Sequence, residues 1–185
     1  MEKNPHHLVM GELTDFLSGE IVADTHDERY RQKLARLLVE GLGYDKADIE
    51  QNREVVIRTG AQAARLKVDF IVFESGKAVM MVKYAPGSLV TRRLSNLALS
   101  RIIFPYQIPV VVTTNGEDAE IVSGDSGRLL GEGLSAIPGI GSDLLGGGAF
   151  HSINAELFDK ASKIAFACWV DGACPCDGDI CTIEE

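Results

Sequence analysis

The sequence predicts an α/β fold in which helices flank both sides of a central mixed β-sheet. Two observations lead to this prediction. Apolar residues recur at helical spacing in two segments of the chain, whereas the segments between and after them are rich in valine, isoleucine and phenylalanine, as strands are. The resulting order of helix, three strands, helix and strand is typical of a three-layered α/β/α domain.

The first helix is expected in the segment THDERYRQKLARLLVEGLGY, residues 25–44. Thr25 and Glu28 form a T-x-x-E pattern that favours a helix start, and Gly43 favours its end. A shorter amphipathic segment, residues 11–22, precedes this helix. The residues expected to face the sheet recur at helical spacing and are Tyr30, Leu34, Leu37, Leu38 and Gly41.

Three successive strands are expected next, as REVVIR, LKVDFIVF and AVMMVKYA, within residues 53–85. A second helix follows over residues 91–104, with Leu94, Leu97 and Ile102 turned inward. The segment IPVVVTTNG is continuously apolar at its centre, which is typical of a strand buried on both faces of a sheet. The two helices are therefore expected to cover the sheet.

A small hairpin, a glycine-rich linker and a last helix make up the remainder of the chain. DAEIV and GRLLGEG flank the turn SGDSG and are expected to pair with each other. The linker GIGSDLLGGG separates them from a helix expected in NAELFDKASKIAFACWV. We therefore divide the chain into a main domain over residues 1–140 and a C-terminal part over residues 141–185 that packs on the same domain.

Length and composition indicate a protein with one hydrophobic core. A chain of 185 residues with 45% hydrophobic and 24% charged residues suits one globular domain. No apolar run approaches the roughly 18–20 residues that are needed to span a bilayer. The first residues, MEKNPHHLVMGEL, do not resemble a secretory signal, so we expect a cytoplasmic location and no membrane partner.

Charge is spread unevenly along the chain. Residues 1–27 carry one basic and six acidic side chains, and residues 102–185 carry three basic and thirteen acidic ones. The middle third, residues 28–101, carries fourteen basic and eight acidic side chains and is the only part with cationic character. The net charge of −9 argues against a general nucleic-acid binder. Solvated helix and strand faces or a binding patch would each account for the cationic middle third.

An aspartate and a lysine stand in two neighbouring predicted strands, Asp69 in the first and Lys83 in the second. Many metal-dependent nucleases arrange these residues in this way, because a divalent cation activates water and a lysine offsets the charge that develops on the phosphate. Such a site needs a second acid two residues before the lysine, where this chain has Met81, a poor ligand for Mg²⁺. Asp69 therefore belongs either to a weakened metal site or to a structural ion pair with Lys67 or Lys83.

Residues 26–140 resemble the N-terminal nuclease domain of the R subunit of type I restriction enzymes, which belongs to the PD-(D/E)XK nuclease superfamily. The matching stretches are DERYRQKLARLLVEGLGY, VDFIV, MMVKYAPGS, IPVVVTTNG and GLSAIP. The resemblance implies a restriction-endonuclease-like α/β/α fold, DNA as a partner and Mg²⁺ as a cofactor. It also implies that Asp69 binds the metal ion, that Lys83 orients or activates the attacking water, and that a helix glutamate, here Glu28, completes the site.

The sequence allows two roles for Glu28 and two roles for a group of three arginines. Glu28 serves either as a helix-capping residue or as a displaced metal ligand. Arg92, Arg93 and Arg101 on the second predicted helix form either an exposed basic face or a set of contacts to DNA phosphates, for which arginine is well suited.

Four cysteines lie within fourteen residues near the C-terminus, in the spacing C-x5-C-x-C-x4-C. Four thiolates suit Zn²⁺ or an iron–sulfur cluster, although this spacing is not the usual pair of C-x2-C knuckles. The alternatives are a buried cysteine on the last helix and free thiols or opportunistic disulfides beyond it. The four residues are Cys168, Cys174, Cys176 and Cys181.

The turn between the two site-bearing strands decides whether Asp69 and Lys83 share a face of the sheet. A two-residue loop would place Asp69 opposite Val82, on the other face from Lys83. A three-residue loop that ends at Gly76 would place Asp69 opposite Met81. We predict the three-residue loop, positive φ at Gly76, and a common face for the aspartate, the methionine and the lysine.

The function predicted from these observations is that of a restriction-endonuclease-like domain with a lost or weakened metal site. Such a domain would bind nucleic acid or a partner protein without efficient cleavage. One alternative is an active Mg²⁺-dependent endonuclease in which another carboxylate replaces the missing one. The other alternative is a protein–protein interaction module.

Overall fold

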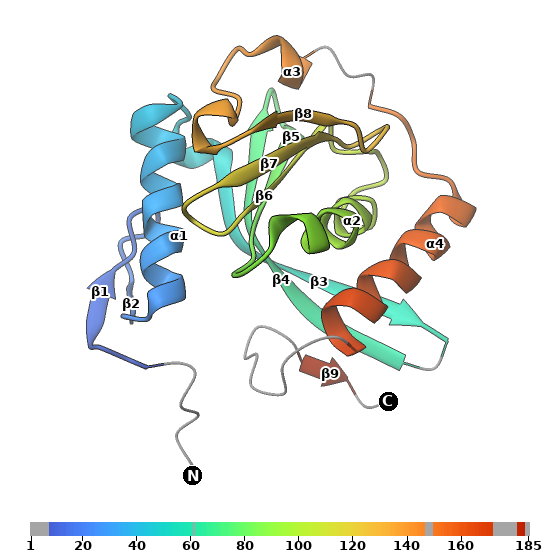
Figure 1. The fold of residues 1–185 in the computed structure, drawn as a ribbon, viewed down its shortest axis with the longest axis horizontal. Helices are drawn as coiled ribbons and strands as arrows, with labels where there is room; N and C mark the ends of the chain where they lie inside the picture. The colour runs from blue at the N-terminus through green and yellow to red at the C-terminus, as the bar shows by residue number, and fades with distance from the viewer. Residues whose placement is uncertain (1–7, 61, 147–149, 172–180, 184–185) are drawn as a thin grey trace.

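In the part of the chain that the structure describes, seven strands form one mixed sheet at the centre of the molecule (Figure 1). The computed structural model describes residues 8–60, 62–146, 150–171 and 181–183. Six strands follow the order β3-β4-β5-β6-β7-β8, and the short β9 (Cys181–Ile183) pairs with β4 outside this path. The six strands are β3 (Ile49–Thr59), β4 (Gln62–Glu74), β5 (Lys77–Tyr84), β6 (Val110–Thr114), β7 (Ala119–Ser123) and β8 (Leu129–Glu132).

Neighbouring strands along this path are antiparallel except for β5 and β6, which are parallel. A parallel pair needs a crossover connection, and α2 (Leu89–Ser100) lies in it. β3, β4 and β5 are neighbours in the sheet, so the prediction of three successive strands is confirmed. The predicted hairpin is confirmed as well, because β7 pairs with β8.

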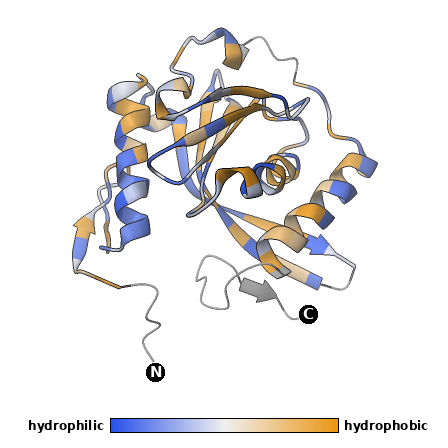
Figure 2. Ribbon diagram, viewed as in Figure 1, coloured by the Kyte–Doolittle hydropathy of each residue, from blue (hydrophilic) through white to orange (hydrophobic). Residues whose placement is uncertain are grey.

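Helices cover both faces of the sheet, and each face has its own hydrophobic core, as the α/β prediction requires (Figure 1). On one face, α1 (His26–Arg36) and the π-helical turn that continues it (Leu37–Gly41) bury Leu34 and Leu38 against the strands. On the other face lie α2 and α4 (Ala155–Phe166), which contact each other. Figure 2 shows hydrophobic residues along the central strands, and along α1 it shows mainly hydrophilic residues near the start of the helix and bands of both kinds toward its end.

The predicted last helix is confirmed as α4. Asn154 caps its start by accepting a hydrogen bond from the Leu157 N–H at 2.8 Å. The helix contacts both α2 and β3, so it packs on the same domain as the sheet. Within the described residues, no helix has the length and apolar character that crossing a membrane requires.

Short elements complete the chain. β1 (Glu12–Thr14) and β2 (Ile21–Ala23) form a separate hairpin where the sequence indicated only an amphipathic segment. Asp15 organises the turn of this hairpin, because its carboxylate accepts hydrogen bonds from the backbone N–H groups of Leu17 and Ser18. The remaining short elements are the 3₁₀ turns Lys46–Asp48 and Leu134–Ala136, α3 (Asp143–Gly146) and the π-helical turn Ala167–Asp171.

Two residues that were predicted to face inward are exposed. Leu94 on α2 is 59% exposed, and Gly41 is exposed at the end of the π-helical turn that follows α1. α2 instead buries the unbroken run from Ser95 to Ser100, because the sheet and α4 cover it from two sides. Leu97 lies within this run and is buried, as predicted.

The connection between β4 and β5 is shorter than predicted. Glu74 pairs with Lys77 across a two-residue loop, in which φ is +49° at Ser75 and +76° at Gly76. Positive φ at both loop residues matches the twist of the flanking strands, which favours this turn over the longer loop. The prediction for φ at Gly76 is therefore confirmed, and the prediction of a three-residue loop is wrong.

A bulge in β5 then shifts the pairing of the two strands by one residue. Val72 pairs with Met80, but the next residue of β4 pairs with Ala78, so Val79 is the extra residue of the bulge. The buried N–H of Ala78 donates a hydrogen bond to the Tyr106 hydroxyl oxygen at 2.9 Å. A residue from the loop after α2 therefore satisfies the backbone at the bulge.

Candidate functional site

Asp69 is a buried carboxylate in β4, with 2% of its surface exposed. Phe70 pairs with Val82 in the antiparallel pair of β4 and β5. The next position along both strands therefore sets Asp69 opposite Lys83, on the same face of the sheet. The Lys83 ammonium donates to the Asp69 Oδ2 atom at 2.9 Å, and the backbone N–H of Tyr84 donates to the same oxygen at 2.9 Å. The structure therefore brings the predicted aspartate and lysine into direct contact.

The second carboxylate oxygen of Asp69 is bound by a residue of α1. The Nε atom of Arg31 donates to the Asp69 Oδ1 atom at 2.7 Å. Burial alone raises the pKa of Asp69, but the charges of Lys83 and Arg31 and the hydrogen bonds that they donate hold this pKa below its ordinary value. Asp69 is therefore ionised at neutral pH and is joined to two cations.

The turn that follows α4 covers Lys83, which is 6% exposed. The Lys83 Nζ atom lies 5.2 Å from the centre of the Trp169 ring, and the guanidinium carbon of Arg92 lies 4.9 Å from the same ring. Two cations thus contact one indole. The Nε1 atom of Trp169 is buried and has no hydrogen-bond partner among the described residues.

Met81 is fully buried in the core beneath α2 and α4. It pairs with Ile71 on one side and with Val111 on the other, so the prediction that Met81 lies opposite Asp69 is wrong. The thioether still shares a strand face with Lys83, because the two residues are two positions apart. It is surrounded by apolar side chains and offers no oxygen atom to the site.

Glu28 is connected to Asp69 through Arg31. The Glu28 backbone N–H donates to the Thr25 hydroxyl oxygen at 3.1 Å, which is a helix-capping contact. The Glu28 carboxylate accepts a hydrogen bond from the Gln32 Nε2 atom at 2.8 Å and lies 3.6 Å from the Arg31 Nη1 atom. Arg31 therefore lies between two carboxylates, one in β4 and one in the first turn of α1.

The three arginines that were predicted to contact nucleic acid lie in different surroundings. Arg93 makes two hydrogen bonds, at 2.8 and 2.7 Å, to the buried carboxylate of Glu120. Arg101 donates to Gln107 and to two backbone carbonyls in the turn between β7 and β8. In the described part of the chain, Arg92 has no carboxylate partner and rests on Trp169. Arg93 and Arg101 thus bind other parts of the fold, whereas Arg92 is half-buried and lies against Trp169.

A row of polar residues crosses the sheet beneath α2. Lys83 pairs with Thr113, and Thr113 pairs with Glu120 on the next strand. The Asn96 side chain donates from α2 to the Thr113 hydroxyl oxygen at 2.8 Å. The Asn96 Oδ1 atom is buried and has no partner among the described residues. α2 therefore covers this polar row with polar side chains of its own.

Metal binding by the C-terminal cysteines remains a prediction. Cys168 is partly buried in the turn after α4 and is a free cysteine. Cys174 and Cys176 lie outside the described residues, and only the backbone of Cys181 is described. Within the described residues, no group of three or more histidine, cysteine, aspartate or glutamate residues could hold a metal ion.

Comparison with known protein families identifies a relationship for the segment that holds this site. The family model described as type I restriction enzyme R protein N terminus (HSDR_N) matches residues 26–138, more than half of the chain. The chain belongs to this family. The resemblance to this family, which was inferred from the sequence over residues 26–140, is thus confirmed over residues 26–138. Neither the curated proteins nor the solved structures gave a match.

The match to the type I restriction enzyme R N-terminal family covers only part of the site. It includes Asp69, Lys83 and Arg31, but it ends before α4 and Trp169. The contact between the indole and the lysine is therefore made by a residue outside the matched segment.

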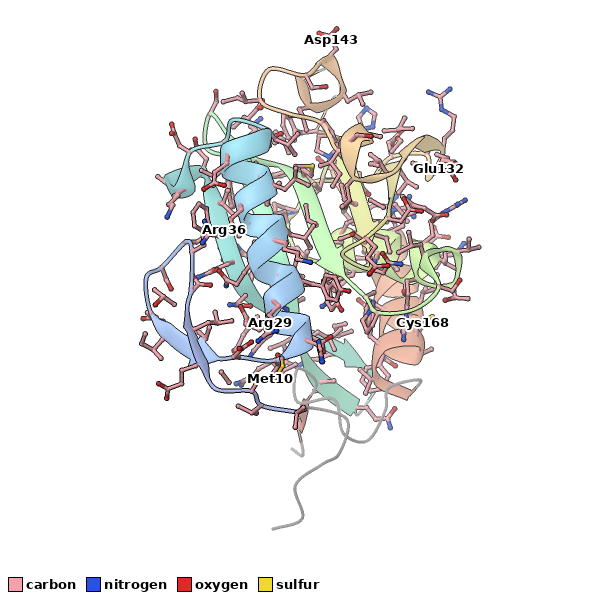
Figure 3. The ribbon with its side chains drawn as sticks, turned by 60° about the vertical axis from the view of Figure 1, so that its left-hand side comes forward. Met10, Arg29, Arg36, Glu132, Asp143 and Cys168 are labelled. Carbon is pink, nitrogen blue, oxygen red and sulfur yellow. The ribbon has the colours of Figure 1, made fainter. Side chains whose placement is uncertain are left out.

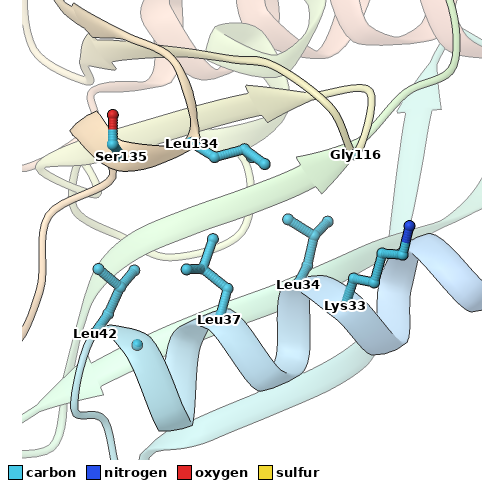
Figure 4. A pocket seen from close by; sticks show the side chains of 8 residues that line it. Lys33, Leu34, Leu37, Leu42, Gly116, Leu134 and Ser135 are labelled. Carbon is cyan, nitrogen blue, oxygen red and sulfur yellow. The ribbon is translucent and has the colours of Figure 1, made fainter.

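This R N-terminal domain also has an apolar pocket of about 490 Å³ along α1 (Figure 4). It opens between the C-terminal half of α1 and the 3₁₀ turn that follows β8. Arg29 and Arg36 project from α1 toward solvent and do not line it (Figure 3). The lining residues are Lys33, Leu34, Leu37, Gly41, Leu42, Gly116, Leu134 and Ser135.

Two residues of the Asp69 site were not identified from the sequence. Arg31 lies three and seven residues before the buried Leu34 and Leu38, a spacing that puts it on the sheet-facing side of α1. From that spacing the sheet-facing position of Arg31 could have been predicted, but not its contact with Asp69. Trp169 could not have been placed in this way, because local spacing does not determine where the last helix docks.

Proposed function

We propose that this domain has a nuclease centre of the PD-(D/E)XK type that no longer cleaves, and that it acts by binding nucleic acid. Its membership in the type I restriction enzyme R N-terminal family supports a nuclease-like domain. The observation that carries the proposal is the position of Met81. It stands two residues before Lys83, where such a centre needs its second acid, and its side chain is fully buried in an apolar core.

The donors around Asp69 do not fit a Mg²⁺ ion. Mg²⁺ demands near-octahedral oxygen ligands, which proteins supply through one or two carboxylates together with water. One oxygen of Asp69 accepts hydrogen bonds from Lys83 and Tyr84, and the other accepts one from Arg31. The thioether of Met81 is soft and uncharged, so it does not replace the missing carboxylate. This donor set favours a centre without metal-assisted hydrolysis.

Binding of nucleic acid is supported by the surroundings of Arg92. Its guanidinium lies on Trp169 at the edge of the site, and the Lys83 ammonium lies on the same ring. A guanidinium recognises phosphate oxygens through its planar fork of donors. Since the chain as a whole carries a net charge of −9, such binding would depend on few cations and would be weak at physiological salt.

A second candidate function, that of a protein–protein interaction module, is favoured by the apolar pocket beside α1. Four of its eight lining residues are leucines, and its volume of about 490 Å³ could admit an apolar side chain of a partner. The acidic character of the chain outside residues 28–101 also suits a protein partner better than DNA.

The decisive experiment combines a cleavage assay with a binding assay. Plasmid nicking in Mg²⁺ or Mn²⁺ would be compared for the wild type, Asp69→Ala and Met81→Glu. Binding of a fluorescent DNA duplex would be measured by anisotropy at several salt concentrations for the wild type, Arg92→Gln and Arg36→Gln. Arg36 is an exposed arginine that pairs with Glu40, so its variant controls for the change in charge.

The proposal expects no nicking by the wild type, salt-dependent binding of DNA, and weaker binding by Arg92→Gln but not by Arg36→Gln. Nicking by the wild type that is lost in Asp69→Ala would instead establish an active endonuclease, with Glu28 as the first candidate for the relocated carboxylate. Absence of both nicking and DNA binding would favour the interaction module.

A further inference from the structure

Arg31 holds together two carboxylates that come from different elements of the fold. Its Nε atom donates to the Asp69 Oδ1 atom at 2.7 Å, and its Nη1 atom lies 3.6 Å from the Glu28 Oε2 atom. Asp69 belongs to β4, and Glu28 belongs to the first turn of α1. We propose that the Arg31 guanidinium takes the place of a divalent metal ion between Asp69 and Glu28, as a cation built into the chain.

The charges around Asp69 require a cation at this point. Asp69 is 2% exposed, and an isolated buried carboxylate is strongly unfavourable. Lys83 satisfies one carboxylate oxygen, but one ammonium does not neutralise both Asp69 and Glu28. With the guanidinium of Arg31 the formal charges of the four side chains sum to zero. Without it they sum to −1, which is a setting that attracts a divalent cation.

Other groups hold both carboxylates in place. The Asp69 carboxylate also accepts hydrogen bonds from Lys83 and from the Tyr84 N–H, and the Glu28 carboxylate accepts one from Gln32. These contacts do not involve Arg31. Removing the guanidinium therefore leaves two oriented carboxylates with a vacated cation position between them.

The arginine has properties that suit this role. A guanidinium stays protonated at every physiological pH and presents donors in a fixed plane, so it can contact two carboxylates at once. The Arg31 guanidinium carbon lies 5.8 Å from the centre of the Tyr84 ring, and the Tyr84 hydroxyl donates to Asp27 at 3.0 Å. The ring thus supports the guanidinium from the strand that carries Lys83.

This inference goes beyond the proposed function, because it concerns the cation between two carboxylates and not the binding of nucleic acid. Its test therefore uses neither DNA binding nor DNA cleavage. This inference and the proposed function can thus fail separately. The Mn²⁺ ion is the probe, since it takes the same oxygen ligands as Mg²⁺ and its free form is measured directly by electron paramagnetic resonance.

The test compares Mn²⁺ binding by the wild type, Arg31→Met and Arg36→Met. Arg36→Met removes the same charge from the same helix, at an exposed residue that pairs with the exposed Glu40. We expect Arg31→Met to bind one Mn²⁺ ion at least about tenfold more tightly than the other two proteins. Mn²⁺ should also raise the unfolding temperature of Arg31→Met and leave that of the wild type unchanged.

Two further measurements complete the test. Adding Glu28→Gln to Arg31→Met should abolish the gained Mn²⁺ binding, because it removes one of the two carboxylates. If Arg31→Met does not fold by itself, it should fold when Mn²⁺ is present during refolding, because metal binding and folding are then coupled. The proposal is overturned by equal Mn²⁺ affinities of wild type and Arg31→Met, by failure to fold even with Mn²⁺, or by binding that survives Glu28→Gln.

Discussion

The Lys83 ammonium lies 2.9 Å from the Asp69 carboxylate because β5 contains one residue more than a regular hairpin requires. The two-residue loop alone would place Asp69 opposite Val82, with its side chain on the other face of the sheet. The bulge at Val79 moves the pairing by one residue and returns Asp69 to the face of Lys83. A local irregularity in the strand therefore assembles the site.

Replacing Asp69 by asparagine should destabilise the fold strongly. The variant leaves the cations of Arg31 and Lys83 without their shared counter-charge in a site that is mostly buried. Breaking a buried ion pair in this way typically costs about 3–5 kcal/mol. The control is Asp159→Asn, because Asp159 pairs with Lys163 on the exposed surface of α4 and should contribute only about 0–1 kcal/mol. Urea unfolding measures the free energy of unfolding of both variants. Equal losses of this free energy in Asp69→Asn and Asp159→Asn would contradict a buried charge network.

Replacing Tyr106 by phenylalanine should weaken the bulge. The variant removes the hydroxyl oxygen that accepts the hydrogen bond of the buried Ala78 N–H at 2.9 Å. An unsatisfied buried amide costs about 1–3 kcal/mol. Tyr30→Phe is the matched control, because the Tyr30 hydroxyl contacts Glu117 at the exposed surface. Hydrogen exchange at the Ala78 amide should become faster in Tyr106→Phe and remain unchanged in Tyr30→Phe. If exchange is unaffected in both variants, the Tyr106 hydroxyl does not support the bulge.

Local patterns were sufficient to predict most of the fold. Helical spacing identified α1, α2 and α4, and runs of branched and aromatic residues identified the central strands, because each helix turns apolar residues toward one of the two cores and the central strands contribute to both. The prediction failed for Leu94, since the sequence does not reveal that α4 covers α2 and changes which side of it is buried.

The site was predicted less completely than the fold. The common face of Asp69 and Lys83 was predicted, but their pairing was not, because it requires the bulge at Val79. The neighbouring Ala78 N–H is satisfied by a hydroxyl group 28 residues further along the chain, which local spacing does not reveal. Arg31 escaped notice because an arginine on a helix is ordinarily assigned to solvent. Only the position of α1 over β4 shows that its guanidinium reaches a buried carboxylate.

Replacing Gly116 by alanine should disturb the tyrosine pair beside the site. φ at Gly116 is +88°, and an added Cβ atom would lie 2.2 Å from the Tyr30 Cδ1 atom. The Tyr30 ring stacks on that of Tyr84, with ring centres 5.8 Å apart. Gly76→Ala is the control, because φ is +76° there and the added Cβ would meet nothing within 4 Å. The control should cost about 1–2 kcal/mol through its backbone alone, and Gly116→Ala about 1–3 kcal/mol more through overpacking. Equal losses of unfolding free energy would show that the tyrosine ring moves aside freely.

Acid should weaken the fold through Asp69, in a pH range that its pKa defines. Burial raises this pKa, but Lys83 and Arg31 together lower it by more than burial raises it. The pKa of Asp69 in the folded protein therefore lies below that in the unfolded chain, which is about 3.9. The folded protein therefore binds fewer protons than the unfolded chain between these two values, and stability rises with pH across that range. The contribution of Asp69 is complete above about pH 4 to 5 and is lost as the pH falls through the folded-state pKa. Asp15, whose pKa is also lowered, should act in the same direction.

A carbon-13 NMR titration of the Asp69 carboxyl group measures its pKa in the folded protein. Urea unfolding between neutral and acidic pH measures how the free energy of unfolding changes with pH. A midpoint above the ordinary aspartate value would mean that burial outweighs the two cations and that Asp69 is not held as an ion pair.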